Sequence, residues 1–508
     1  MFIILIFLFI SIANCEKQIC EIDACDSLKE GKFFIEEYGH QLLENITETI
    51  FSKLERRIRS LEQPVWPLSR QNNRWTECSK GPCECIPETK TMNCWQLNIP
   101  SLPFEQIIPY DTYVIDLGIN KLTTLHKDAF KHLLFLNELD LFDNELDYLP
   151  ESLFDDLENL KYLRLHKNFL TDLPKNIFWG IRNMKSLDLS LNRLTNLPED
   201  IFIVCRDMVM LYLSGNKLQE LPEGLLSEMK FLEDLDVSRN ELKDLPLSIF
   251  KDLYSLKRLN LAENELTDLK DEIFVSLGNL DYLNLRKNRI LKVSGKLLSA
   301  MQNLQILQLA SNRIAEQLTS DTFKDLTELR ELNLGQNYIL DLPEELFSQN
   351  GKLKKLILYS NSLTELKEKS LLGLENLSTL LMNNNLLENI HPNLFLHAPN
   401  IEKLHLDSNK FRYLQPKTLD ALENITSIKL TKNQWHCDCN ILYLALWISD
   451  NNNKLWDSQP SCRGPGDLSG ELLKNMRFQH LCDGQWASMM NLAPRVAVKH
   501  KLEDQIEN

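Results

Sequence analysis

The amino-acid sequence predicts an α/β solenoid: a curved stack of short coils that share one parallel β-sheet on the inner side of the curve. Three observations lead to this prediction. An asparagine recurs at a fixed interval, apolar residues alternate just before it, and a cluster of cysteines stands at each end of the repeated region. A fixed period of roughly 20–50 residues indicates stacked units, each too small to bury a core alone.

The recurring asparagine marks the period. It stands in 14 successive repeats at intervals of 24 residues, except for the interval from Asn312 to Asn337, which is 25. Its short side chain offers two donors and one acceptor, so it can bridge the turn after a strand and the neighbouring coil. Leaving such groups buried and unpaired costs roughly 1–3 kcal/mol each. The asparagines are Asn120, Asn144, Asn168, Asn192, Asn216, Asn240, Asn264, Asn288, Asn312, Asn337, Asn361, Asn385, Asn409 and Asn433.

Apolar residues alternate ahead of each asparagine, as Leu187, Leu189 and Leu191 do ahead of Asn192. Such alternation is typical of a short strand with one buried face, so successive coils should place their strands side by side in a parallel sheet. A Phe or Leu follows ten residues after the asparagine in nearly every repeat, for example Phe130. This bulk fills the far side, and the stack should therefore curve with the sheet inside.

Composition excludes several classes of protein. The 508 residues are 43% hydrophobic and carry a formal net charge of -16, which argues against nucleic acid as the main partner. The sequence has no Gly-rich phosphate loop, no H-E-x-x-H and no G-x-S-x-G motif. We therefore expect a protein with no enzymatic activity, no cofactor and no metal.

The first residues predict secretion. Residues 1–15 are apolar and end in small residues, which is typical of a signal peptide cleaved after Ala13 or Cys15, although a basic n-region is missing. The apolar run is shorter than the roughly 20 residues that a membrane span needs, and no later segment is long and apolar enough. We expect a product in the extracellular space without a membrane span.

Eight of the twelve cysteines form two tight groups. In a secreted chain such groups predict disulfides, although the sequence alone allows three pairings in each group. Cys205, at a leucine position of the repeat, should be a buried and inert thiol. The two groups are Cys78, Cys83, Cys85 and Cys94, and Cys437, Cys439, Cys462 and Cys482.

The pattern LxxLxLxxNxLxxLPxxxFxxLxx resembles the leucine-rich repeat in its extracellular 24-residue form, over about residues 111–432. The cysteine groups resemble the amino- and carboxy-terminal caps of Slit-type domains, Toll-like ectodomains and acid-labile-subunit-like proteins, with Gln434 where the family usually has proline. The resemblance implies a horseshoe-shaped solenoid and pairs the first cysteine with the third and the second with the fourth. The implied disulfides are Cys78–Cys85, Cys83–Cys94, Cys437–Cys462 and Cys439–Cys482.

A separate segment precedes the amino cap. Cys20 and Cys25 are followed by apolar residues at steps of three and four from Ile35 to Leu61, which predicts an amphipathic helix that ends before Pro64. Two interpretations remain open. A local Cys20–Cys25 disulfide closes a loop and the helix docks on the amino cap, or the helix pairs with another chain in a homo- or heterodimer with intermolecular disulfides.

Three Asn-x-Ser/Thr sequons, Asn45, Asn376 and Asn424, predict glycosylation. Asn376 and Asn424 stand at the same register just before a strand, two repeats apart, so glycans on both should project from one edge and leave the concave face open.

The residues six, four and two positions before each recurring asparagine should form the concave face. The charged residues among them are mostly acidic from the coil of Asn120 to that of Asn240 and mostly basic from Asn264 onward, a polarity that can orient a partner. Two small apolar groups interrupt the charges. The expected ligand contacts are Asp140, Tyr162, Arg164, Tyr212, Asp236, Arg258, Arg286, Ile357, Tyr359 and Leu381.

These expectations define a function and a domain order. The chain should be a secreted scaffold whose concave face binds a protein or microbial-surface ligand in innate immunity, or else a matrix, adhesion, guidance or growth-factor carrier component. The expected partner is an extracellular protein or glycan. The expected parts are a signal peptide (1–15), a Cys pair with a helix (16–74), the amino cap (75–110), the repeats (111–432), the carboxy cap (433–485) and a polar tail (486–508).

Overall fold

The computed structural model describes residues 51–456 and 458–482, which divide between two units, 1–62 and 63–508. In the first unit, residues 51–61 are helical, within the range where the sequence predicts a helix. The signal segment, Cys20, Cys25, Asn45, the remainder of the predicted helix and the polar tail lie outside the described residues. A search of the described residues found no helix with the length and apolar character to cross a membrane.

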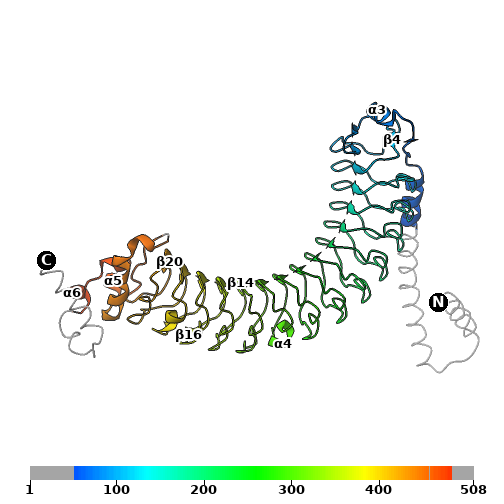
Figure 1. The fold of residues 1–508 in the computed structure, drawn as a ribbon. Helices are drawn as coiled ribbons and strands as arrows, with labels where there is room; N and C mark the ends of the chain where they lie inside the picture. The colour runs from blue at the N-terminus through cyan, green and yellow to red at the C-terminus, as the bar shows by residue number, and fades with distance from the viewer. Residues whose placement is uncertain (1–50, 457, 483–508) are drawn as a thin grey trace, which may run out of the picture. The chain divides into compact units, whose positions relative to one another are not determined.

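The second unit is a solenoid whose coils each add one short strand to a sixteen-stranded sheet (Figure 1). In the amino cap β2 (Glu84–Ile86) runs antiparallel to β3 (Thr91–Asn93), and from β3 onward all neighbours are parallel. The remaining strands of this sheet are β5 (Val114–Asp116), β6 (Glu138–Asp140), β7 (Tyr162–Arg164), β8 (Ser186–Asp188), β9 (Met210–Tyr212), β10 (Asp234–Asp236), β11 (Arg258–Asn260), β12 (Tyr282–Asn284), β13 (Ile306–Gln308), β14 (Glu331–Asn333), β15 (Lys355–Ile357), β17 (Thr379–Leu381), β19 (Lys403–His405) and β20 (Ser427–Lys429).

The other elements are short. Figure 1 shows the strands of the main sheet along the inner side of the solenoid, with α4 and β16 on the outer side. The predicted architecture of a curved solenoid with the sheet inside is confirmed. These elements are the pairs β1 (Leu68–Ser69) with β4 (Ile108–Pro109) and β16 (Glu365–Leu366) with β18 (Asn389–Ile390), and the helices α3 (Arg74–Cys78), α4 (Gly295–Leu298), α5 (Leu442–Asp450) and α6 (Phe478–Leu481).

The recurring asparagines join each coil to the next. Asn264 is representative: its Nδ2 donates to the carbonyl of Val237 in the preceding coil at 3.0 Å and to that of Leu261 in its own coil at 3.1 Å. Its Oδ1 accepts from the backbone N–H of Leu242 at 3.2 Å. All fourteen are buried, none more than 8% exposed. We call this row the asparagine ladder.

A sharp turn precedes every rung of the ladder. The residue before each ladder asparagine has a φ between 52° and 67°, in the left-handed region, and only Gly215 among the fourteen is a glycine. Leu191 and Ile119, with φ of 54° and 53°, hold this conformation although it costs a non-glycine residue roughly 1–2 kcal/mol. The buried hydrogen bonds of the asparagine that follows offset that cost.

Phenylalanines fill the far side of the coils, as the sequence predicts. Phe154 and Phe178 stack with ring centroids 6.4 Å apart, and Phe323 and Phe347 with centroids 6.0 Å apart. These rings are fully buried, because one coil supplies the contact that its neighbour lacks.

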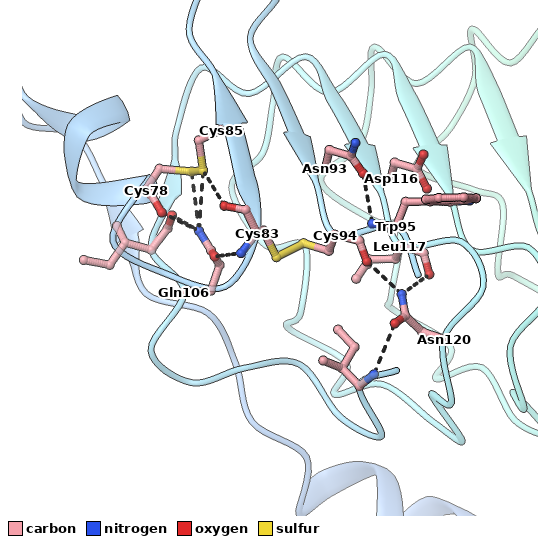
Figure 2. The surroundings of a disulfide bond; sticks show 12 residues. Cys78, Cys83, Cys85, Asn93, Cys94, Trp95, Gln106, Asp116, Leu117 and Asn120 are labelled. Carbon is pink, nitrogen blue, oxygen red and sulfur yellow. Dashed lines mark hydrogen bonds between the residues drawn. A yellow bond between two sulfur atoms is a disulfide. The ribbon is translucent and has the colours of Figure 1, made fainter. Parts of the chain in front are cut away.

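Figure 2 shows the amino cap, in which Cys78 pairs with Cys85 and Cys83 with Cys94. Buried Gln106 fills the space between them: its Nε2 donates to the Cys78 carbonyl at 3.1 Å and its Oε1 accepts from the Cys83 N–H at 3.0 Å. The first ladder residue, Asn120, donates to the Cys94 carbonyl at 2.9 Å. The cap is therefore tied to the repeats by the same bond that joins one repeat to the next.

The carboxy cap closes the other end with Cys437–Cys462 and Cys439–Cys482, the pairing that the family resemblance implies. Trp435 stacks on Phe411 with centroids 6.1 Å apart, so an indole ends the row of rings. Cys205 is unpaired and buried, and burial raises the pKa of its thiol to about 12, which keeps it protonated.

Replacing Asn264 by Ala should lower the free energy of unfolding by about 1–3 kcal/mol, because the N–H of Leu242 stays buried without a partner. The carbonyls of Val237 and Leu261 each lose one of two bonds and keep the one from Asn240 or Asn288. Urea unfolding followed by circular dichroism measures the loss. The matched control is Asn279→Ala, since the hydrogen bond from Asn279 to the Tyr254 carbonyl is exposed. Equal losses in the two variants would contradict the role given to the ladder.

Candidate functional site: the concave face of the sheet

The three-residue strands present side chains in straight rows. From β5 onward, the central Leu or Ile of each strand is buried, and the residues on either side of it face the inner side of the solenoid. Strands pair in register, for example Asp140 with Arg164 and Arg164 with Asp188. Side chains in a row therefore stand about 4.7–4.9 Å apart from strand to strand. We call this surface, with the residue two positions after each strand, the concave face.

The concave face is acidic over its first strands, and the arginine that lies there, Arg164, forms ion pairs. Arg164 Nη1 lies 2.6 Å from a carboxylate oxygen of Glu138 and 2.9 Å from one of Asp140. Asp116 forms no ion pair among the described residues, and burial raises the pKa of its carboxyl above the ordinary value. Asp116 is thus a carboxyl at this end of the face that no ion pair of the described residues neutralises.

The middle of the face is a network of side-chain hydrogen bonds. The Tyr212 hydroxyl donates to Asp234 at 3.1 Å, and Arg258 donates to the same carboxylate oxygen from Nε at 3.1 Å and from Nη2 at 2.6 Å. Asn260 Nδ2 donates to Asp236 at 3.0 Å. Burial, together with the negative charge of Asp234, raises the pKa of Tyr212 to about 12.

An apolar group follows on β15 and β17. Ile357 of β15 is next to Leu381 of β17 in the register. Tyr359 leans over the preceding coil at Gly335, where a Cβ would lie 2.8 Å from the Tyr359 ring. Ile357 is only 5% exposed, so Leu381 and Tyr359 supply the accessible surface of this group.

A tryptophan stands at each end of the concave face. Trp95 in the amino cap is 46% exposed and lies beside Asp116 in Figure 2. Trp456 in the carboxy cap is 49% exposed, and its backbone N–H donates to the carbonyl of Ile428 in β20 at 2.9 Å. Neither position belongs to the repeat, so the repeat pattern gives no signal for them.

The structure places the predicted contacts on one face, and several of them bind one another or a neighbouring side chain. Asp140 and Arg164 bind each other, Tyr212 and Arg258 bind Asp234, and Asp236 accepts from Asn260. Tyr162 and Arg286 are exposed, whereas Asp140 at 7% and Ile357 at 5% exposure have little surface left for a ligand.

A second row of asparagines lies on the edge of the solenoid, and the sequence analysis did not predict it. Each donates to a carbonyl 25 residues earlier, as Asn376 does to Gly351 at 2.7 Å. In the sequence, this row can be recognised as an asparagine that stands fifteen residues after a ladder asparagine. Only some repeats have it. Both described sequons stand at that position, and both are exposed. The row contains Asn159, Asn183, Asn279, Asn303, Asn376 and Asn400.

A family model described as leucine rich repeat matches the chain at residues 112–168, 158–218, 230–290, 278–339, 327–387 and 376–434, more than half of its length. The chain belongs to the leucine-rich repeat family. Such a solenoid is typically a non-catalytic scaffold for interactions, and no enzyme family was identified. Its disulfides at both ends fit a capped leucine-rich repeat protein.

Two curated mouse relatives match this leucine-rich repeat chain over short stretches. Carboxypeptidase N subunit 2 is 36% identical over 52 residues, 10% of this chain and 10% of that protein. SLIT and NTRK-like protein 4 is 35% identical over 54 residues, 11% of this chain and 6% of that protein. The matched stretches thus cover no more than a tenth of either relative.

Solved structures share the leucine-rich repeat fold over longer stretches. A chain of the Toll–Spatzle complex of Drosophila aligns with a TM-score of 0.63 and 23% identity, over 77% of this chain and 58% of that one. A leucine-rich repeat protein of Leptospira interrogans aligns with 0.62 and 29%, over 72% and 88%. TLR13 in complex with ssRNA13 aligns with 0.54 and 22%, over 72% and 53%.

Tyr212 should remain protonated when other tyrosines ionise, because its pKa is raised from 10.0 to about 12. A raised folded-state pKa stabilises the fold below pH 10, and this contribution should be lost as the pH rises from 10 to about 12. NMR of ring-labelled tyrosine, assigned with Tyr212→Phe, measures the titration. Asp234→Asn should lower the pKa by removing a negative neighbour; an unchanged titration would contradict the network.

Proposed function

We propose that this chain is an extracellular, non-catalytic binding protein that holds a protein partner on its concave face. The observation that carries the proposal is the set of exposed aromatic side chains on this rigid surface: Trp95, Tyr162 and Trp456. Aromatic residues are enriched among the residues that dominate binding energy at protein interfaces. Because the asparagine ladder fixes the strands, these side chains are already in place before a partner arrives, which lowers the entropy cost of binding.

The shape of the face favours a macromolecule over a small substrate. Small-molecule sites are concave pockets that bury most of the ligand, whereas the main sheet presents sixteen strands side by side. A repetitive open surface also excludes water poorly, which makes it unsuited to catalysis. Two settings suit such a protein: recognition of a protein or microbial-surface ligand in innate immunity, and a matrix, adhesion, guidance or growth-factor carrier role. The identity of the partner would decide between these two settings.

Three features support an extracellular location and the predicted division of the chain. Four disulfides close the caps, and disulfides persist in oxidising compartments. The sequence begins with a segment typical of a signal peptide, and the two described sequons lie on an exposed edge. We propose that the signal segment is removed, that the helix, caps, repeats and tail form the mature chain, and that Asn376 and Asn424 carry glycans.

The helical residues 51–61 support the dimer as a proposal. Phe51, Leu54, Ile58 and Leu61 are 70%, 53%, 51% and 52% exposed. Their steps of three, four and three residues are those of a coiled-coil seam. A second chain with the same seam would cover these side chains, whereas a monomer leaves them in water.

Tyr359→Ala should weaken partner binding about tenfold, roughly 1.4 kcal/mol, and leave thermal unfolding nearly unchanged, because the ring lies on the surface. The partner is captured from extracellular fluid on the immobilised wild-type protein, identified, and its affinity measured for each variant. Tyr254→Ala is the matched control, since Tyr254 is 53% exposed away from the main sheet. Equal loss in both variants would remove the concave face from the proposal.

The full chain expressed in cultured animal cells should appear in the medium, lose mass on treatment with peptide N-glycosidase, and sediment as a dimer.

Leu54→Glu combined with Ile58→Glu should give monomers, since a charge in the seam has no partner. Lys53→Glu, beside the seam, should not. Gels with and without reductant show whether cysteines link the chains. A wild-type monomer at all concentrations contradicts the dimer, and retention inside the cell contradicts the location.

A further inference from the structure

The carboxy cap extends the concave face by one rung beyond the last repeat. Leu455 lies parallel to Ile428 of β20, and the backbone bond from Trp456 to Ile428 continues the sheet pattern. Trp456 therefore follows Lys429 in the row that already contains His405 of β19. The surface that a partner meets ends in cap residues.

Two ammonium groups gather at this added rung. The Nζ atoms of Lys403 and Lys429 lie 5.2 and 5.8 Å from the centroid of the Trp456 ring. Each contact of this kind contributes roughly 0.5–1 kcal/mol at an exposed site. The indole thus holds two like charges close to each other, with Lys454 two residues away along the chain.

In the described part of the chain, two lysines at this rung, Lys403 and Lys454, lack the ion pairs that Arg258 and Lys355 form elsewhere on the face. Arg258 pairs with Asp234 at 2.6 Å and Lys355 with Glu331 at 3.2 Å. Among the described residues, no ion pair is formed by Lys403 or Lys454. Like charges held together repel, and an anion between them relieves that repulsion.

An apolar surface adjoins the cations in the same row. Leu381 of β17 is paired in register with His405, and Ile357 of β15 with Leu381. In order along the sheet, the row therefore contains Ile357, Leu381, His405, Lys429 and Trp456. A polysaccharide with sulfate groups matches the cationic part alone, whereas a polypeptide with both acidic and apolar side chains matches the whole row.

We infer that this end of the concave face binds an acidic segment of a partner protein, with carboxylates on Lys403 and Lys454 and an apolar side chain on Leu381. The inference rests on the proposed function and names the chemistry of the partner. Exposed ion pairs contribute only about 0.2–1 kcal/mol each. The apolar contact and Trp456 supply most of the affinity, while the charges select the partner and speed its approach.

The probe is a short synthetic peptide of glutamates with leucine and phenylalanine at its centre, titrated against the full chain by fluorescence anisotropy at two salt concentrations. We expect it to bind, and to lose affinity at least about tenfold in Lys403→Glu with Lys429→Glu and in Trp456→Ala. Added salt should weaken binding, because exposed charges are screened. The same peptide with lysines in place of glutamates should not bind.

The matched control is Lys251→Glu with Lys270→Glu, which makes the same charge change at exposed lysines outside the strands of the main sheet. Circular dichroism confirms that each variant is folded, and Lys403→Gln with Lys429→Gln replaces the reversed charges if the glutamate variant does not fold. The inference is overturned if the control loses as much affinity as the face variants, if the peptide does not bind, or if heparin binds these lysines and the peptide does not.

A partner captured from extracellular fluid separates this inference from the proposed function. Loss of that partner in Tyr359→Ala but not in the lysine variants leaves the proposed function standing and overturns the acidic-segment inference. Loss in the lysine variants supports both. Retention in every concave variant overturns both.

Discussion

The buried amide of the asparagine ladder is the interaction on which the rest of this solenoid depends. Each strand of the main sheet is only three residues long, too short to be stable by its own backbone bonds. The chain turns immediately afterwards through a residue in the left-handed region, and this turn leaves carbonyls such as those of Val237 and Leu261 inside the stack. Each of these carbonyls accepts from two successive ladder asparagines, and Asn264 therefore binds both its own coil and the preceding one. Removing one asparagine takes a bond from two successive turns and leaves the N–H of Leu242 without its partner.

The same constraint determines where specificity can reside. The positions of leucine, asparagine and phenylalanine serve packing and hydrogen bonding, so specificity must reside in exposed side chains, among them those that face the inner side and those of the caps. The caps do not have to follow the repeat pattern, because they end the stack rather than continue it. Trp95 and Trp456 are both cap residues, and both are about half exposed. The two ends of the concave face therefore differ from its repeated middle for a structural reason.

Features that depend on position within the repeat could be predicted, and features that depend on the contact of two coils could be predicted only in part. Fourteen asparagines at a nearly constant spacing predict the asparagine ladder, and the row of phenylalanines follows from the same spacing. Arg164, by contrast, looks like an isolated positive charge in the sequence. Because strands pair in register it stands beside Asp140, and its long side chain also reaches Glu138. The contact between Lys403 and Trp456 joins a repeat to a cap across 53 residues, and no periodicity relates them.

These pairings change the electrostatic interpretation of the concave face. An acidic first half and a basic second half suggest a dipole that extends along the solenoid, yet Arg164, Arg258 and Lys355 are each neutralised by a carboxylate on a neighbouring strand. Among the described residues, the concave charges without an ion pair include Asp116 at one end, Asp236 and Arg286 between the ends, and Lys403 with Lys454 at the other end, and many strands separate the two ends. The Debye length at physiological ionic strength is about 8 Å, less than the width of two strands at roughly 4.7–4.9 Å each. The two ends therefore act independently, and a partner senses each charge only where it touches it.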